Sequence, residues 1–264
     1  MAAGKRWARD ELFVTLNIYH KLTFGAFHSR NPVIVKLAEK LKRTPGSIAM
    51  KLSNFASFDP HLKLRGIQGL AGASNLDRVV WDEFHAELNE TVPDSENALR
   101  ELFEVDEDTN IIILPKLGFQ KEPRRLDGET EIEANVKQRR GQDYFRESVL
   151  NNFGGRCGVS QIALRDLLIA SHILPWSSNP DERLNVRNGL CLSRLHDAAF
   201  DRGLIAFDDN FQLMLSSRLT AELNQKAIDA NFGKYEGKAL NIPQDAALPE
   251  PAFLATHREN IFED

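Results

Sequence analysis

The chain has few cysteines and no long apolar run, and both features limit the classes of protein it can belong to. Only two of its 264 residues are cysteines, too few for the disulfide framework of a small secreted domain. No apolar run reaches the roughly 18 residues that a membrane-spanning helix needs, and the first residues, MAAGKRWARDELF, lack the apolar core of a secretory signal. We therefore expect a cytoplasmic protein with no membrane partner, in which Cys157 and Cys191 are free thiols.

Charge is distributed unevenly along the sequence. Residues 1–80 carry 13 Lys and Arg against five Asp and Glu, a net charge of +8, whereas residues 81–136 carry a net charge of −11. A basic segment joined to an acidic one predicts that the basic segment meets a polyanion. The alternative is a solvated basic surface without a partner.

Residues 6–58 have the periodicity of three helices. In NPVIVKLAEKL (31–41), apolar residues recur at helical spacing after an asparagine cap and a proline at the first helical position. Thr44 and Pro45 repeat that start for a further helix, which ends before Asp59-Pro60. The other helix is expected in RWARDELFVTLNIYHKL (6–22).

A basic three-helix unit with a tight turn between its last two helices resembles a helix-turn-helix. The stretch from Trp7 to Phe58 is also similar to the Myb/SANT type, although its turn, LKRT, contains no glycine. The resemblance implies that the third helix contacts DNA, whereas a helical bundle that binds protein is the alternative. The candidate contacts are Lys42, Arg43, Ser47, Met50, Lys51 and Asn54.

The sequence predicts an α+β protein with a helical DNA-recognition domain over residues 1–90 and a second domain over residues 137–264. Residues 91–136 contain a short strand candidate, IIILP (111–115), in polar surroundings, and are expected to form an acidic linker region with little core. In the second domain we expect a buried strand in DLLIASHI (166–173), a hairpin in LIAFDDNFQLML (204–215) and an irregular tail from residue 241 onward.

Two histidines flank an asparagine in the second domain. His172 ends an apolar strand, Asn188 stands at a turn, and His196 opens a helical pattern. They lie in the motifs ASHILPW (170–176), NGLCL (188–192) and LHDAAFDRG (195–203), which follow RGQDYFR (140–146) and CGVS (157–160). Strand-His, loop-Asn and helix-His in this order resemble the HNH endonucleases, which have the ββα-metal fold.

The resemblance implies a role for each member of the motif. Histidine takes up a proton near neutral pH, and the resemblance makes His172 the general base of phosphodiester hydrolysis. It implies that Asn188 orients the loop or the base, and it places the third-motif residue, His196, among the metal ligands. Arg139, Arg140 and Arg146 are candidates to contact phosphates, or else they belong to a solvated helix face.

The metal ligands remain open between neighbouring residues. Many HNH sites have a ligand directly before the first histidine, where this chain has Ser171, a poor ligand. Asp197 and Asp201 are four residues apart, so their carboxylates share one helical face. We expect His196 and Asp201 as ligands, with Asp197 competing for the role of His196. An imidazole with hard oxygens suits Mg²⁺ or Mn²⁺, and Ni²⁺ and Zn²⁺ are the alternatives.

These observations predict a metal-dependent DNA endonuclease, and nucleases of this make-up often serve restriction of foreign or modified DNA. One alternative is a zinc-stabilised, non-catalytic nucleic-acid-binding module, in which Cys157, His172, Cys191 and His196 hold the metal. A protein-interaction scaffold with a decayed nuclease is the other. The oligomeric state stays open, with a homodimer as one arrangement.

Overall fold

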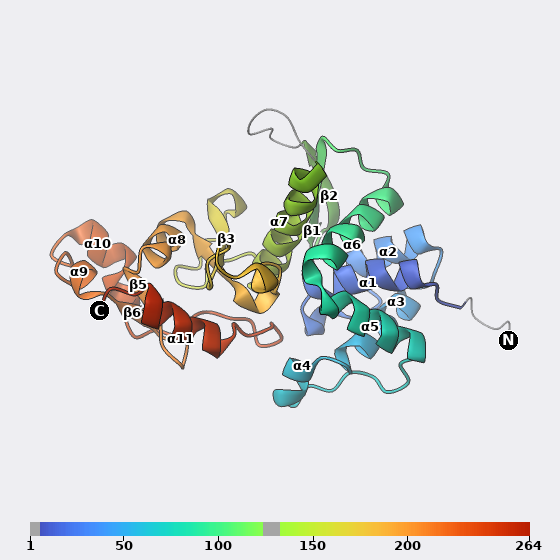
Figure 1. Ribbon diagram of the computed structural model, residues 1–264, viewed down its shortest axis with the longest axis horizontal. Coiled ribbons are helices and arrows are strands. Elements are labelled where there is room, and N and C mark those ends of the chain that lie inside the picture. The colour runs from blue at the N-terminus through green and yellow to red at the C-terminus, as the bar shows by residue number, and fades with distance from the viewer. Residues whose placement is uncertain (1–5, 124–132) are drawn as a thin grey trace. The chain divides into compact units, whose positions relative to one another are not determined.

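The fold was analysed in a computed structural model, which describes residues 6–123 and 133–264 (Figure 1). Residues 1–5 and 124–132 lie outside the described residues, including part of the predicted acidic linker region. The chain divides into two compact units, unit 1 (Met1–Asn151) and unit 2 (Asn152–Asp264). Each unit is described by itself.

Unit 1 combines helices with one β-hairpin. Its elements are α1 (Arg9–Lys21), α2 (Pro32–Leu41), α3 (Pro45–Ala56), α4 (Pro60–Leu64), α5 (Asn75–Ala86), α6 (Leu88–Phe103), β1 (Thr109–Leu114), β2 (Gly118–Pro123) and α7 (Glu133–Asn152). Helix α1 packs against α3, α5 and α6, and α2 packs against α3 and β2 (Figure 1). The strands β1 and β2 pair antiparallel, with Thr109 opposite Pro123.

The three helices predicted in residues 6–58 are present as α1, α2 and α3. The Asn31 side chain accepts a hydrogen bond from the Val33 amide at 2.9 Å, and the Thr44 hydroxyl accepts one from the Ser47 amide at 3.2 Å. In the turn between α2 and α3, Lys42 takes the left-handed conformation, with φ of 52°. A lysine thus occupies a backbone conformation that glycine usually supplies.

The division into units differs from the predicted domain boundaries. Helix α6 and strand β1 fall in the region expected to be a linker, yet they bury Val92, Leu99, Phe103 and Ile113. Glu96 of α6 forms a buried ion pair with Lys21 of α1. Although α6 is acidic in composition, its apolar residues recur at helical spacing and form a buried face. Unit 1 therefore includes the region expected to be a linker and extends to Asn151, which takes in most of α7.

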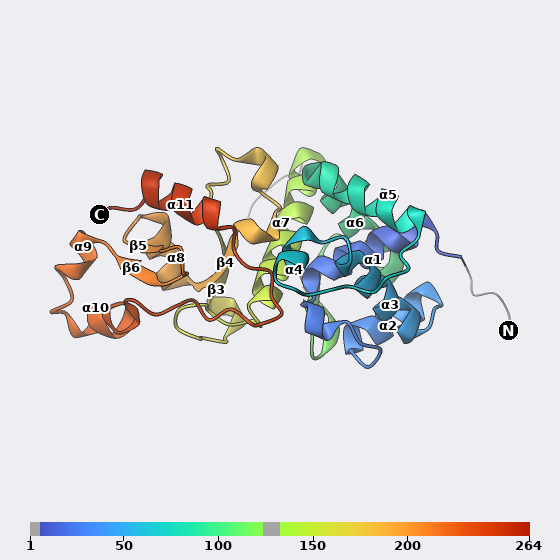
Figure 2. The same ribbon diagram turned by 90° about the horizontal axis from the view of Figure 1, so that it is seen from below.

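Unit 2 is a mixed unit of short strands and short helices, which makes the whole chain α+β. Its principal elements are β3 (Leu168–His172), β4 (Gly189–Ser193), α8 (Arg194–Asp201), β5 (Ile205–Phe207), β6 (Leu213–Leu215), α9 (Ser217–Thr220), α10 (Lys226–Asn231) and α11 (Pro251–Asn260). Helix α8 contacts both strands of the β3–β4 hairpin and also β5 of the β5–β6 hairpin (Figure 2). The predicted strand at 166–173 and the predicted hairpin at 204–215 are both found.

The tail expected to be irregular contains a helix, α11, that packs against β5. Its His257 is buried and stacks on Phe200 of α8, with ring centroids 3.8 Å apart, and its Nε2 donates to the Phe200 carbonyl at 3.1 Å. The contact with α8 explains why this helix is stable despite a weak periodicity in its own sequence. Across residues 6–123 and 133–264, the search for a helix of the length and apolarity needed to cross a membrane finds none.

Candidate active site in the β3–β4–α8 motif

The β3–β4 hairpin places His172 at the end of a strand. His172 is the last residue of β3 and lies opposite Gly189, the first residue of β4. Residues 173–187, here called the connecting loop, join the two strands. Because the hairpin is antiparallel, the loop starts and ends beside His172, and Asn188 stands at its return.

The connecting loop orients the His172 ring. His172 Nε2 donates a hydrogen bond to the Arg183 carbonyl over 2.9 Å, and the imidazole meets the Trp176 ring edge-on, with centroids 5.3 Å apart. A carbonyl oxygen can only accept, so Nε2 carries the hydrogen of the neutral ring and Nδ1 carries the lone pair. The loop therefore selects the tautomer as well as the orientation.

The surroundings of His172 favour its neutral form. Burial lowers the pKa of the imidazole and the positive charge of Arg183 lowers it further, while the hydrogen bond to the Arg183 carbonyl partly offsets both effects. The Arg183 side chain is itself held by the loop, since its Nε donates to the Trp176 carbonyl at 2.7 Å and its guanidinium lies 5.1 Å from the Trp176 ring centre. A histidine that is neutral near physiological pH is able to accept a proton.

Asn188 fixes the ends of the connecting loop. Its Oδ1 accepts from the Leu174 amide at 2.7 Å, and its Nδ2 donates to the Glu182 carbonyl at 3.0 Å. The side chain is fully buried. Of the two roles left open for Asn188, these contacts favour the one in which it orients the loop, and through the loop His172.

Helix α8 presents a pair of carboxylates on one face. Burial raises the pKa of Asp197, which Ser171 of β3 and Arg194 partly offset. Burial also raises the pKa of Asp201, and the charge of Asp197 raises it further, against the opposing effect of Arg202. The charge of Asp197 disfavours the ionised form of Asp201, so a cation held by these carboxylates, on a helix that packs against β3, would relieve the repulsion.

The expectation that His196 is a metal ligand does not fit its position. His196 is buried, with an exposed fraction of 1%. Its Nε2 donates to the Asn231 carbonyl at 2.9 Å, and its Nδ1 lies 2.7 Å from the Ser193 hydroxyl and 3.9 Å from the Cys157 sulfur. Successive helical residues point about 100° apart, so His196 faces the core while Asp197 faces β3.

Cys157 and His196 form the centre of a polar cluster inside unit 2. Burial raises the pKa of the Cys157 thiol, but hydrogen bonds with His196 and Ser160 outweigh it and bring the pKa to about 6. Within residues 6–123 and 133–264, no group of three or more His, Cys, Asp or Glu side chains is arranged to hold a metal ion. The four-ligand zinc site therefore does not assemble in the described structure.

The two carboxylates of α8 nevertheless fit Mg²⁺ or Mn²⁺. Mg²⁺ keeps several waters and is commonly held by one or two carboxylates together with substrate phosphates. Asp197 and Asp201 supply that number of hard oxygen ligands. A complete protein cage, of the type absent from the described residues, is not required for such an ion.

Several predicted DNA contacts of unit 1 serve packing instead. Lys51 is buried and pairs with buried Asp77 at 2.8 Å, and Asn54 is also buried. Arg43 pairs with Glu11 at 2.6 Å and stacks on the Trp7 ring at 3.8 Å. Lys51 of the helix face chosen from the sequence therefore faces α5, a contact that the local periodicity of α3 could not reveal.

The other residues predicted to contact nucleic acid differ in their exposure to solvent. Arg140 is buried in unit 1, paired with Glu107 and bonded to Asn97 at 3.0 Å, so it is not positioned for a phosphate. Arg139, Arg146 and Ser47 are half-buried, whereas Lys42 and Met50 are exposed. Of the charged candidates, Lys42 is the one that the structure leaves on the surface.

The roles of Arg183 and Trp176 were not predicted from the sequence. Trp176 lies in the motif ASHILPW, but nothing in its spacing indicated contact with His172. Arg183 lies eleven positions after His172, in a loop whose fold depends on Asn188. The signal available in the sequence was the presence of two arginines, Arg183 and Arg187, between the first histidine and the asparagine.

Comparison with known proteins agrees with this geometry. Residues 157–208 match the family model described as HNH endonuclease. The match covers the β3–β4 hairpin and α8, and it supports membership of that segment in the HNH family and a nuclease, hence hydrolase, activity acting on nucleic acid. HNH nuclease domains generally use a divalent metal. No curated protein matches the chain.

Proposed function

We propose that the chain is a metal-dependent DNA endonuclease in which His172 is the general base. The observation that carries this proposal is the held, neutral imidazole at the end of β3, on the segment that matches the HNH family. Hydrolysis of a phosphodiester requires a deprotonated water, neutralisation of phosphate charge and help for the leaving oxygen. Restriction of foreign or modified DNA is the role that we propose for this activity.

In this mechanism the chain's own residues handle the proton. Nδ1 of His172 accepts a proton from water, while the Arg183 carbonyl keeps the ring oriented through Nε2. The positive charge of Arg183 disfavours the imidazolium, which promotes return of the proton to solvent between turnovers. Asp197 and Asp201 would hold the divalent cation, which would neutralise charge on the phosphate and the leaving oxygen.

Substitution of His172 tests this function directly. The His172→Ala variant should fold normally and lose plasmid cleavage by roughly 10²–10⁴-fold, the usual contribution of a positioned acid or base. Cleavage is measured on modified and unmodified plasmid in Mg²⁺, Mn²⁺, Ni²⁺ and EDTA. His28→Ala, which changes an exposed histidine of unit 1, is the matched control. Near wild-type nicking by His172→Ala would show that the proposed base is wrong.

We also propose that residues 1–80 of unit 1 position DNA, on the support of their net charge of +8. Lys42 is exposed in the turn before α3, so Lys42→Ala should weaken DNA binding without loss of stability. Each phosphate contact contributes about 0.9 to the slope of log affinity against log salt on duplex DNA, and this variant should lose that amount. An equal loss in the control Lys116→Ala would argue against a specific role for the turn.

The alternative function is the zinc-stabilised, non-catalytic module, of whose four expected ligands Cys157 and His196 lie together in the described structure without forming a complete site. It requires stoichiometric bound zinc and no nicking of plasmid by the pure protein. The nuclease requires nicking that EDTA abolishes. Measurement of bound metal beside the plasmid assay separates the two.

A further inference from the structure

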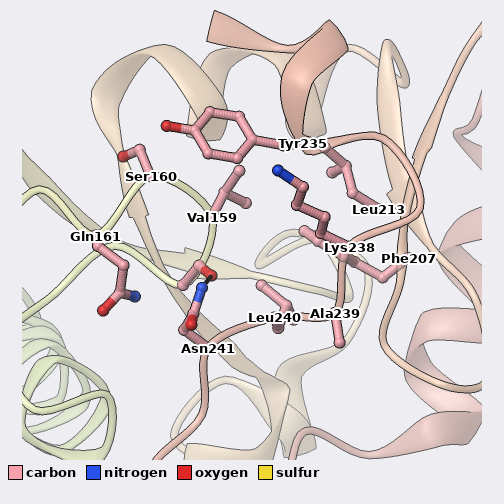
Figure 3. Close-up of a pocket in the computed structure, with 11 residues that line it drawn as sticks. Val159, Ser160, Gln161, Phe207, Leu213, Tyr235, Lys238, Ala239, Leu240 and Asn241 are labelled. Atoms are coloured by element: carbon pink, nitrogen blue, oxygen red, sulfur yellow. Dashed lines mark hydrogen bonds between the residues drawn. The ribbon is translucent and has the colours of Figure 1, made fainter.

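Unit 2 contains a cavity that the proposed mechanism does not use. It has a volume of about 170 Å³ and lies between the turn at residues 158–161, the β5–β6 hairpin and residues 235–241. Figure 3 shows Tyr235 and Lys238 toward one end of this cavity, here called the Tyr235 pocket, and Gln161 and Asn241 toward the other.

The backbone around the Tyr235 pocket is held before any ligand binds. The backbone amide of Asn241 donates to the Gly158 carbonyl at 2.8 Å, and the backbone amide of Leu213 donates to the Lys238 carbonyl at 2.9 Å. Gly158 and the Leu240 side chain are in close contact, since a Cβ at position 158 would lie 2.8 Å from that side chain. The pocket therefore does not need a conformational change to form, which reduces the cost of binding.

The polar groups of the pocket suit a planar ligand with hydrogen-bonding edges. Gln161 and Asn241 both line the pocket. Gln161 Nε2 donates to the Cys157 carbonyl at 2.9 Å, and Asn241 Nδ2 donates to the Gly158 carbonyl at 3.2 Å, so both side chains are held in place. An amide carries donors and an acceptor and can pair with the polar edge of a nucleobase, while Val159 and Leu240 provide apolar walls.

The other end of the pocket suits an anion beside an aromatic ring. Lys238 Nζ lies 5.9 Å from the centre of the Tyr235 ring, and Lys234 Nζ lies 4.7 Å from it. Both lysines are exposed, while Tyr235 is half-buried. Aromatic rings next to lysines or arginines are the recurring elements of single-strand recognition, in which bases stack and phosphates meet cations.

The pocket is linked to the proposed active site through α8. The Tyr235 ring contacts the His196 ring, with centroids 5.9 Å apart, and His196 precedes Asp197 on that helix. His196 and Asp197 point in different directions, so a ligand in the pocket would not be the scissile group itself. It would be a neighbouring part of the same substrate.

We propose that the Tyr235 pocket binds one unpaired nucleotide of the nucleic acid substrate, with its base enclosed by Tyr235, the two amides and the apolar walls and its phosphate at Lys238. This proposal rests on the proposed nuclease function. A free mononucleotide has the same chemistry as a nucleotide in a strand, so both are used as probes.

The test measures binding by the full-length protein in EDTA, where cleavage does not interfere. Probes are short single strands containing the fluorescent base 2-aminopurine, and the four nucleoside 5′-monophosphates. Tyr235→Ala should weaken single-strand binding about tenfold or more and abolish the fluorescence change caused by burial of the base. Lys238→Gln, an exposed change that preserves folding, should lower the salt slope by about 0.7. The control is Lys226→Gln, an exposed lysine of α10 that does not line the pocket.

The possible outcomes separate this proposal from the nuclease assignment. Equal binding by Lys238→Gln, Lys226→Gln and wild type, with no fluorescence change on any probe, would overturn the pocket proposal even if plasmid is cut normally. Tight binding of mononucleotides, with no preference for strands, would identify a free nucleotide as the ligand and overturn the substrate assignment. If plasmid is never cut but the pocket variants still lose strand binding, the nuclease function fails and nucleotide binding stands.

Discussion

At the residue scale, the metal-binding hypothesis depends on two neighbouring residues of α8, His196 and Asp197, whose side chains point in different directions. His196 faces the core and bonds through both ring nitrogens. Asp197, one residue later, faces Ser171 of β3 and raises the pKa of Asp201. The carboxylates, and not the imidazole, are therefore the groups that we propose to hold the cation.

Conversion of either carboxylate to an amide should change the metal requirement. Asp197→Asn and Asp201→Asn should each raise the Mg²⁺ or Mn²⁺ concentration for half-maximal cleavage by at least roughly tenfold, because each removes one charged ligand. The measurement is plasmid cleavage across a metal titration, with the exposed Asp10→Asn as control. A variant with an unchanged metal titration would show that its aspartate is structural.

At the scale of elements, the connecting loop between β3 and β4 holds His172 in the orientation and neutral form that the proposed general base requires. One loop residue, Arg183, contacts the imidazole through its carbonyl and Trp176 through its side chain. Asn188 holds the loop at Leu174 and Glu182. The role that we propose for His172 thus depends on a loop closed by a fully buried residue, Asn188.

Removing the hydrogen bonds that hold the connecting loop should slow cleavage while His172, Asp197 and Asp201 stay unchanged in sequence. Asn188→Ala leaves buried backbone groups without partners, which costs about 1–3 kcal/mol, and should slow cleavage while DNA affinity is retained. Amide hydrogen exchange should increase at residues 173–187. Asn179→Ala, which removes loop bonds nearer the surface, serves as control. Unchanged exchange in the loop together with lost cleavage would instead indicate direct contact of Asn188 with substrate.

At the scale of the whole molecule, a half-buried histidine of unit 1, His20, makes stability depend on pH. His20 packs between Phe84 and His85, and its Nε2 has no hydrogen-bond partner among the described residues. Burial, and to a smaller extent His85, lowers the pKa of His20 well below its usual value. Folding therefore favours the neutral ring.

The sign of this dependence follows from the direction of the shift. Below the ordinary histidine pKa of about 6.5, the unfolded chain binds a proton that the folded chain does not, so the free energy of unfolding falls by up to about 1.4 kcal/mol per pH unit. Above that pH the contribution is fully present. Urea unfolding of wild type from neutral to acidic pH should show this loss, and His20→Phe should reduce it. An identical reduction in the exposed-site control His28→Phe would argue against His20.

Much of the local structure and the identity of the main motif could be predicted from the sequence. Caps at Asn31 and Thr44 located helix starts, because cap and proline preferences act within a few residues. The order of His172, Asn188 and His196 indicated the family of residues 157–208, which the comparison supports. These features can be predicted from motif spacing because each depends on residues within a single strand, turn or helix.

The tertiary structure decided which polar residues are available for chemistry. Lys51 and Asp77, or Arg140 and Glu107, are far apart in the sequence, so only folding shows that these charges neutralise each other. The same holds for His196, whose partners Cys157 and Asn231 come from distant segments. Spacing along one helix gives the direction of a side chain relative to its neighbours, whereas burial and pairing depend on what packs against that side.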